Sequence, residues 1–299
     1  MPYKHYADKV QHDANYYAKS RGQFIMKTEK IPKERSQLKP MRHIRIKGPK
    51  HGLKIAVIPD VQAKNGVPLD HLRWAGLYIA MKKPDVVVCI GDFADMPSLS
   101  HYDVGTRNFE GRRYVTDIEA AKYAMSVLMA PILNMKTEDR PALYMTRGNH
   151  EDRIERVSKE DSKLHGLVSS DDLEYEKWGW NVFPFMQPIV IGGVAFCHYF
   201  PSGVMGKPIT TARSLLTKLH MSCFAGHQQG RDIAYSRKAD GGDLTAIISG
   251  SFYQHNEDYL TPFTNNHWRG MYMLHEVKDG SFDEMAVSLA YLRRRFKGK

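Results

Sequence analysis

The order of apolar segments between residues 53 and 147 restricts the possible fold more than any other feature of this sequence. Short apolar runs with the length of buried strands occur three times, at 54–59, 85–90 and 142–145. Between them lie two segments whose apolar residues repeat at helical spacing, 72–80 and 118–132. Strands that alternate with helices in this way predict an α/β domain built on a parallel sheet.

The second half of the chain is richer in predicted strands. The candidates are 189–191, 194–197, 222–225, 233–236, 244–249, 271–277 and 285–291. Glycine-rich turns separate three neighbouring pairs and predict hairpins, at Gly192-Gly193, Asp240-Gly241-Gly242 and Asp279-Gly280. The charged segment 151–180, between the two halves, is predicted to be a helical flap beside the functional site.

Length and cysteine content narrow the class of protein. A chain of 299 residues allows one large domain or two small ones. No apolar stretch approaches the roughly 18 residues of a membrane span, and no secretory signal is recognisable at the N-terminus. The three cysteines, an odd number within apolar runs, favour a reducing compartment, so we expect a cytoplasmic protein.

Positive charge is concentrated at the two ends of the chain. Residues 1–50 hold 13 Lys and Arg against 4 Asp and Glu, and residues 293–299 hold five basic residues and no acid. The intervening segment has 25 basic and 29 acidic residues. We expect a basic N-terminal arm over 1–50, with a possible short helix. Basic ends favour binding of DNA or RNA, with solvated tails or docking on a protein partner as the alternatives.

Polar residues that can bind metals follow five of the predicted strands. These clusters are Asp60-Val-Gln62, Gly91-Asp92-Phe-Ala-Asp95, Arg147-Gly-Asn149-His150-Glu151, His198 and Gly226-His227-Gln-Gln229. Ligands of open α/β sheets bind outside the carboxyl ends of the strands, so the five clusters are expected to converge. Each cluster alone is a weak signal, and the ordered set of five is specific.

In order and spacing, these blocks resemble the signature of the calcineurin-like metallophosphoesterase superfamily over about residues 53–277. Gly-Asn-His-Glu-Asp-Arg at 148–153 and Asn-Asn-His-Trp-Arg-Gly at 265–270 are similar to a branch common in bacteriophages and prophages. The resemblance implies an α/β fold of two packed mixed β-sheets flanked by helices. It also implies a metallophosphoesterase domain over 51–299 with a basic C-terminal tail, acting in a bacterial host cytoplasm if phage-encoded.

The resemblance further implies two metal ions at the edge of the sheets. Asp92 would bridge them, and Asn149, His198 and His227 would complete the second site, while Asp60 would hold the first metal. A hydroxide bound to the metals would attack the phosphorus atom of a phosphate ester.

Three more residues receive catalytic roles from the resemblance. His150 would protonate the leaving-group oxygen, with Asp95 orienting its ring. Arg147 occupies the position at which some protein phosphatases of the superfamily bind phosphate. The resemblance thus implies a hydrolase that acts on phosphate ester bonds.

The sequence departs from the family pattern at two positions, where glutamine replaces histidine. Gln62 stands in a block that is usually Asp-x-His, and Gln229 in one that is usually Gly-His-x-His. By resemblance both belong to the first metal site, which with Asp60 and Asp92 becomes an all-oxygen site. Oxygen ligands favour Mn²⁺ or Mg²⁺ over Zn²⁺ or Fe. The alternatives are a degenerate site and replacement by His255 or His267.

The sequence is compatible with more than one class of substrate. The basic ends and the phage-like blocks favour a nuclease or nucleotide phosphodiesterase. A protein or small-molecule phosphomonoesterase is the alternative, although Met96-Pro97 replaces the Arg-Gly that usually follows the second block in protein phosphatases. A catalytically weakened scaffold or nucleic-acid-binding protein is an alternative of another class. The oligomeric state is unknown.

Overall fold

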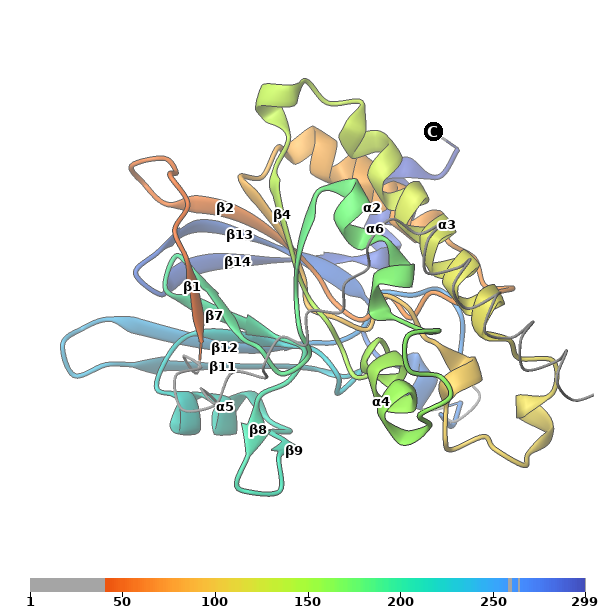
Figure 1. Cartoon of the computed structure of the whole chain (residues 1–299). Helices are drawn as coiled ribbons and strands as arrows, with labels where there is room; N and C mark the ends of the chain where they lie inside the picture. The colour runs from red at the N-terminus through yellow and green to blue at the C-terminus, as the bar shows by residue number, and fades with distance from the viewer. Residues whose placement is uncertain (1–40, 258–259, 263, 299) are drawn as a thin grey trace, which may run out of the picture. The chain divides into compact units, whose positions relative to one another are not determined.

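The computed structural model describes residues 41–257, 260–262 and 264–298, and these residues build two six-stranded sheets and their flanking helices (Figure 1). The α/β fold of two mixed sheets, expected from the resemblance, is confirmed. Predictions made for residues 1–40 lie outside the described residues.

The first sheet contains the three strands predicted from the alternating pattern. Its order is β14-β13-β2-β3-β4-β5, with β2 to β5 parallel and β13 antiparallel to both neighbours. The strands are β2 (Leu53–Ile58), β3 (Val86–Cys89), β4 (Ala142–Thr146), β5 (Trp180–Phe183), β13 (Gly270–Lys278) and β14 (Ser281–Ser288).

The second sheet comes mainly from the later part of the chain, in the order β1-β6-β7-β10-β12-β11. Parallel pairing of β10 with β7 and β12 places the ends of these strands at one edge. Its strands are β1 (Arg42–Ile44), β6 (Ile189–Ile191), β7 (Val194–Cys197), β10 (Cys223–Ala225), β11 (Arg231–Arg237) and β12 (Asp243–Ser249). A small hairpin joins β8 (Pro201–Ser202) and β9 (Lys207–Pro208).

The two sheets pack face to face, and helices cover their outer faces. Side chains alternate along β2: Ile55 and Val57 pack against the second sheet, while Ala56 and Ile58 pack against helices. The helices are α2 (Asp70–Lys82), α3 (Tyr114–Leu133) and α6 (Leu289–Phe296) over the first sheet, α5 (Ala212–Leu219) over the second, and α4 (Asp152–Glu160). Figure 1 shows α2, α3 and α6 gathered on one side.

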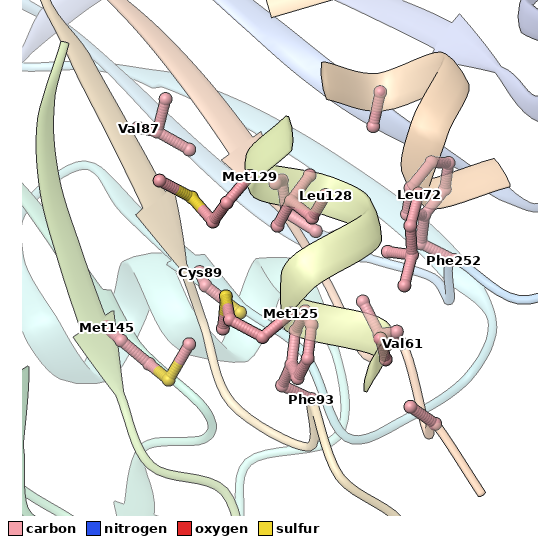
Figure 2. Packing of buried hydrophobic residues seen from close by; sticks show 14 of the residues in the cluster. Val61, Leu72, Val87, Cys89, Phe93, Met125, Leu128, Met129, Met145 and Phe252 are labelled. Carbon is pink, nitrogen blue, oxygen red and sulfur yellow. The ribbon is translucent and has the colours of Figure 1, made fainter. Parts of the chain in front are cut away.

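Helix α3 supplies much of the packing over the first sheet. Figure 2 shows Met125, Leu128 and Met129 of this helix beside Val87 and Cys89 of β3. All five side chains are buried. Close packing of this layer holds the strands whose ends carry the polar clusters.

The structure differs from the sequence-based expectations at three segments. Residues 42–44, expected within the arm, form an edge strand that pairs with β6, although the domain boundary at residue 51 itself stays a prediction. Within 151–180, the flap contains one α-helix, α4, followed by short 3-10 turns and the start of the unpredicted β5. The strand predicted over 285–291 ends at Ser288, which instead caps α6 through its side chain.

Two further expectations concern membrane spans and cysteines. Within the part of the chain that the structure describes, no helix has the length and apolar character needed to cross a membrane. Cys89, Cys197 and Cys223 are all buried free thiols, as their positions in apolar runs predicted.

Candidate metal centre

The five polar clusters converge at the carboxyl ends of strands from both sheets. Asp60, Asp92 and Asn149 follow the parallel strands β2, β3 and β4. His198 and His227 follow the parallel strands β7 and β10 of the other sheet. Because the sheets pack face to face, the two sets of loops meet, and the contacts below join them.

Four side chains form the most compact cluster. The Oδ1 of Asn149 lies 2.8 Å from His198 Nε2 and 2.8 Å from His227 Nδ1. His198 Nε2 is 3.2 Å from Asp92 Oδ2. One ligand atom from each of Asp92, His198 and His227 falls within 4.8 Å of the other two. These four residues are the set predicted for the second metal site.

The electrostatics of this cluster favour a cation. The Nδ1 of His198 lies 3.1 Å from the Ile90 carbonyl, and an N–H donated there leaves the Nε2 lone pair facing Asp92 and Asn149. Burial by itself lowers the pKa of His198, but the Asp92 and Asp60 carboxylates together outweigh burial and raise the pKa to about 9. For Asp92, burial raises the pKa of the carboxyl group. The neighbouring His150 and His198 outweigh this effect and hold the pKa below its usual range. Oxygen atoms and imidazole lone pairs pointed at one place fit a divalent ion.

The residues predicted for the first metal site are buried and incompletely paired. Asp60 Oδ2 accepts a hydrogen bond from the His227 N–H at 2.8 Å, while Asp60 Oδ1 has no hydrogen-bond partner among the described residues. Burial raises the pKa of Asp60 to about 7. Both amide atoms of Gln62 are buried without a hydrogen bond to any described residue. Unpaired buried oxygens cost free energy, and a cation would compensate that cost.

Gln229 and the two alternative histidines lie within hydrogen-bond distance of neighbouring side chains. Tyr253 donates its hydroxyl hydrogen to Gln229 Oε1 at 2.9 Å. His267 Nε2 lies 2.7 Å from Ser251 Oγ, and His255 Nε2 lies 2.6 Å from Glu257 Oε1. Gln229 keeps an oxygen lone pair for a metal, because a carbonyl oxygen has two.

The backbone is strained at four of the candidate ligands. Gln62, Asp92, His227 and Gln229 all have positive φ angles, of 47°, 48°, 68° and 59°. Non-glycine residues rarely adopt this conformation, which costs about 1–3 kcal/mol each and concentrates at functional sites. The coincidence of strain with the predicted ligands supports a functional role for these loops.

Two motif glycines are required by close approach to the carboxylates. A Cβ atom at Gly148 would lie 2.0 Å from Asp92 Oδ1, and one at Gly226 would lie 2.2 Å from Asp60 Oδ1. Any side chain at either position would displace a carboxylate. The glycine that precedes Asn149 and the one that precedes His227 thus allow the loops to meet.

His150 and Asp95 are in contact, as predicted. His150 Nδ1 lies 2.8 Å from Asp95 Oδ1, and its Nε2 lies 3.6 Å from Asp92 Oδ2. Burial lowers the pKa of His150, but the Asp92 and Asp95 carboxylates raise it above its usual value. The ring is therefore held beside the cluster of candidate ligands in a field that favours its protonated form.

Asp95 also begins a largely buried chain of charged side chains that the sequence did not reveal. Lys64 Nζ lies 2.9 Å from Asp95 Oδ2 and 2.7 Å from Glu257 Oε2. Glu257 in turn contacts His255. Although burial raises the pKa of Asp95, His150 and Lys64 hold it below its usual range, so Asp95 stays ionised beside the ring. No motif indicated Lys64 or Glu257, which are far apart in the sequence.

Glu151 is a second residue to which the sequence assigned no role. Its carboxylate accepts hydrogen bonds from the backbone N–H groups of Asp92, Ala94 and Gly148, at 3.0, 2.9 and 2.8 Å. The side chain is fully buried and fastens the loop after β3 to the loop after β4. Burial, together with the Asp92 carboxylate, raises its pKa. Its place within Gly-Asn-His-Glu was the one available signal.

The arginines occupy different surroundings. The Arg147 guanidinium donates a hydrogen bond to Ser170 Oγ and lies 3.7 Å from Asp171, so its contacts are with the flap and its phosphate-binding role stays a prediction. Arg153 donates to the Asp95 carbonyl oxygen at 2.9 Å and lies beside the site. Arg156 pairs with Glu160 on the exposed side of α4.

Comparison with known proteins identifies similar sequences. The sequence model of one family, calcineurin-like phosphoesterase, matches residues 53–250, which is more than half of the chain and contains every candidate metal ligand. The chain is also similar to the Gene 54 protein of Mycobacterium phage L5, at 28% identity over 206 residues. The alignment covers 66% of this chain and 76% of that protein, in agreement with the phage-like sequence blocks.

We predict that Gly226→Ala weakens metal binding by roughly 10- to 100-fold, because its Cβ would displace the Asp60 carboxylate. Gly230→Ala in the same loop is the matched control, since a Cβ there meets its nearest atom at 3.8 Å. Titration calorimetry with Mn²⁺ measures both affinities. Equal affinities for the two variants would contradict a role for Asp60 in metal binding.

Proposed function

Because this chain belongs to the calcineurin-like phosphoesterase family, we propose that it is a metal-dependent phosphodiesterase whose substrate is a nucleic acid or a nucleotide. The family consists of hydrolases that act on phosphate esters and bind two divalent metals. The convergence of Asp92, Asn149, His198 and His227 is the single observation that carries this proposal.

The residues proposed to hold the ions form two sets that share Asp92. The first set is Asp60, Gln62, Asp92 and Gln229, and the second is Asp92, Asn149, His198 and His227. When bound, the ions would withdraw charge from the phosphoryl oxygens and lower the pKa of a water molecule. The oxygen atoms and lack of imidazole in the first set favour Mn²⁺, with Mg²⁺ next.

His150 is proposed to donate a proton to the leaving-group oxygen. The ion pair between its Nδ1 and Asp95 Oδ1, 2.8 Å apart, orients the ring, so the proton available for transfer is on Nε2. That atom faces the Asp92 side of the cluster. Lys64 balances the charge of Asp95, which keeps this carboxylate an acceptor rather than a competing acid. Arg147 is proposed to contact a substrate phosphate, and Arg153, beside Asp95, is the second candidate.

Three features support a diester, in particular a polynucleotide, over a monoester. The chain lacks the Arg-Gly that follows the second block in protein phosphatases. Its N- and C-terminal segments are strongly basic. Its mycobacteriophage relative supports an origin in a phage or prophage, for which we propose the bacterial host cytoplasm as the place of action.

The proposed reaction predicts that Mn²⁺-loaded protein hydrolyses bis-p-nitrophenyl phosphate faster than p-nitrophenyl phosphate. Asp92→Asn should abolish both activities, because both metal sites lose their shared carboxylate. Asp283→Asn, at an exposed position on β14, is the control and should retain activity. Faster monoester turnover would indicate a phosphomonoesterase, and no turnover by metal-loaded wild type would indicate the weakened scaffold.

The proposed Mn²⁺ preference predicts the effect of restoring both histidines. Gln62→His with Gln229→His should shift the metal that gives the highest activity from Mn²⁺ toward Zn²⁺ or Fe, because imidazole favours these ions. Activity with each metal, measured at equal metal occupancy, checks this. An unchanged preference would show that the two glutamines do not belong to one metal site.

The proposed acid role predicts that His150→Ala slows cleavage of a dinucleotide by roughly 10²–10⁴-fold. The loss should be much smaller for a p-nitrophenyl diester, because its leaving group departs without a proton. The ratio of kcat values for the two substrates is the measurement. Equal losses on both substrates would assign His150 a structural or metal-positioning role.

A further inference from the structure

A basic pocket lies where helix α6 meets the segment that follows β12. Its volume is about 980 Å³, and its walls come mainly from α2, α6 and residues 254, 256 and 265–269. None of the described residues that line it is acidic, and four are cationic: Arg269, Arg293, Arg294 and Lys297. A pocket of this charge favours an anionic ligand.

Within the part of the chain that the structure describes, three cations of α6 have no ion-pair partner that would neutralise them. The side chains of Arg293, Arg294 and Lys297 make no hydrogen bond or ion pair with any residue that the structure describes. Like charges one turn apart repel one another. The helix dipole favours cations in this last turn, but it favours Arg295 equally, and Arg295 does not line the pocket. The dipole therefore does not explain why these cations face one cavity.

The other lining residues suit a nucleotide. Asn256, Asn266 and Gln254 contribute side-chain amides, and the partly buried Trp268 ring lies at the wall, with the Arg231 guanidinium 4.9 Å from its centre. Single-stranded nucleic acids bind to proteins through cations on the phosphates and aromatic rings on the bases. Its volume of about 980 Å³ has room for nucleotides of a single strand.

The pocket adjoins the candidate metal centre through a short series of contacts. His267 lines the pocket, and its Nε2 lies 3.4 Å from the Tyr253 hydroxyl. The same hydroxyl donates to Gln229, a proposed metal ligand. A strand with one phosphodiester at the metal centre could therefore place a neighbouring part of its backbone in the pocket.

We propose that this pocket binds phosphates of a single nucleic-acid strand beside the phosphodiester that is cleaved. The proposal rests on the proposed function for its choice of substrate. It assigns phosphate binding to Arg293, Arg294 and Lys297. In this arrangement α6 is part of the substrate-binding surface and not only a basic tail.

The test compares single charge removals in one helical turn of the full-length protein. Binding of a fluorescein-labelled oligothymidylate is followed by anisotropy at several salt concentrations, with EDTA present so that no cleavage occurs. Arg293→Ala and Arg294→Ala should each weaken binding roughly 5- to 10-fold at about 50 mM salt and lower the salt slope by about 0.7. Arg295→Ala, the matched control, should change affinity less than about twofold.

Several outcomes would overturn the proposal. An Arg295→Ala variant as weak as the other two would indicate diffuse attraction without a pocket, and unchanged binding in all three would exclude the pocket. Stronger binding of a duplex, with the same dependence on Arg293 and Arg294, would contradict the single-strand assignment. Hydrolysis of bis-p-nitrophenyl phosphate by the Arg295→Ala control should equal that of the wild type, and its loss would show damage to the fold or reaction centre. If the wild-type protein does not hydrolyse this diester, the proposed function is wrong, whereas the binding measurements still test the pocket.

Discussion

Face-to-face packing of the two sheets is the constraint on which the candidate metal centre depends. The apolar layer between them joins Ile55 and Val57 of the first sheet to Phe196 and Phe224 of the second. This layer aligns the edges at which parallel strands of both sheets end, and carboxylates from one sheet meet histidines from the other. Neither sheet alone contains a complete ligand set. The hydrophobic effect thus brings together groups that would otherwise repel or remain hydrated.

Buried charges and backbone strain at this site cost folding free energy, which the rest of the fold must offset. Asp60, Asp92 and Glu151 are all buried carboxylates, and several ligand residues have left-handed backbone conformations. Glu151 compensates part of the cost, because its carboxylate accepts three backbone hydrogen bonds and fastens the loops that carry Asp92 and Asn149. Loops held this firmly are preorganised for ligand binding, which reduces the ordering required when an ion or substrate arrives.

Prediction from sequence succeeded where local pattern and chemistry agreed. The apolar runs identified β2, β3 and β4, and Asp60, Asp92 and Asn149 lie directly after these strands, while their role as metal ligands stays a prediction. Prediction failed for a strand at the edge of a sheet and for an ion pair between residues far apart in the sequence. Strand β1 is short and partly exposed, so its three residues show no clear apolar run. The Lys64–Glu257 ion pair joins residues 193 positions apart, and no periodicity encodes such a contact.

By itself, the sequence determined the α/β class, the hairpins and the identity of the candidate ligands, because hydrophobic periodicity, turn glycines and metal-binding side chains are local properties. The tertiary structure alone decided which groups surround those ligands: Glu151 behind the loops, Lys64 and Glu257 beyond His150, and the flap against Arg147. It also decided that α6 directs Arg293 and Arg294 into a pocket near Gln229. Charge composition predicts attraction to a polyanion. Only the packing of α6 determines on which surface its arginines lie, because the orientation of a helix depends on contacts between segments that are distant in the sequence.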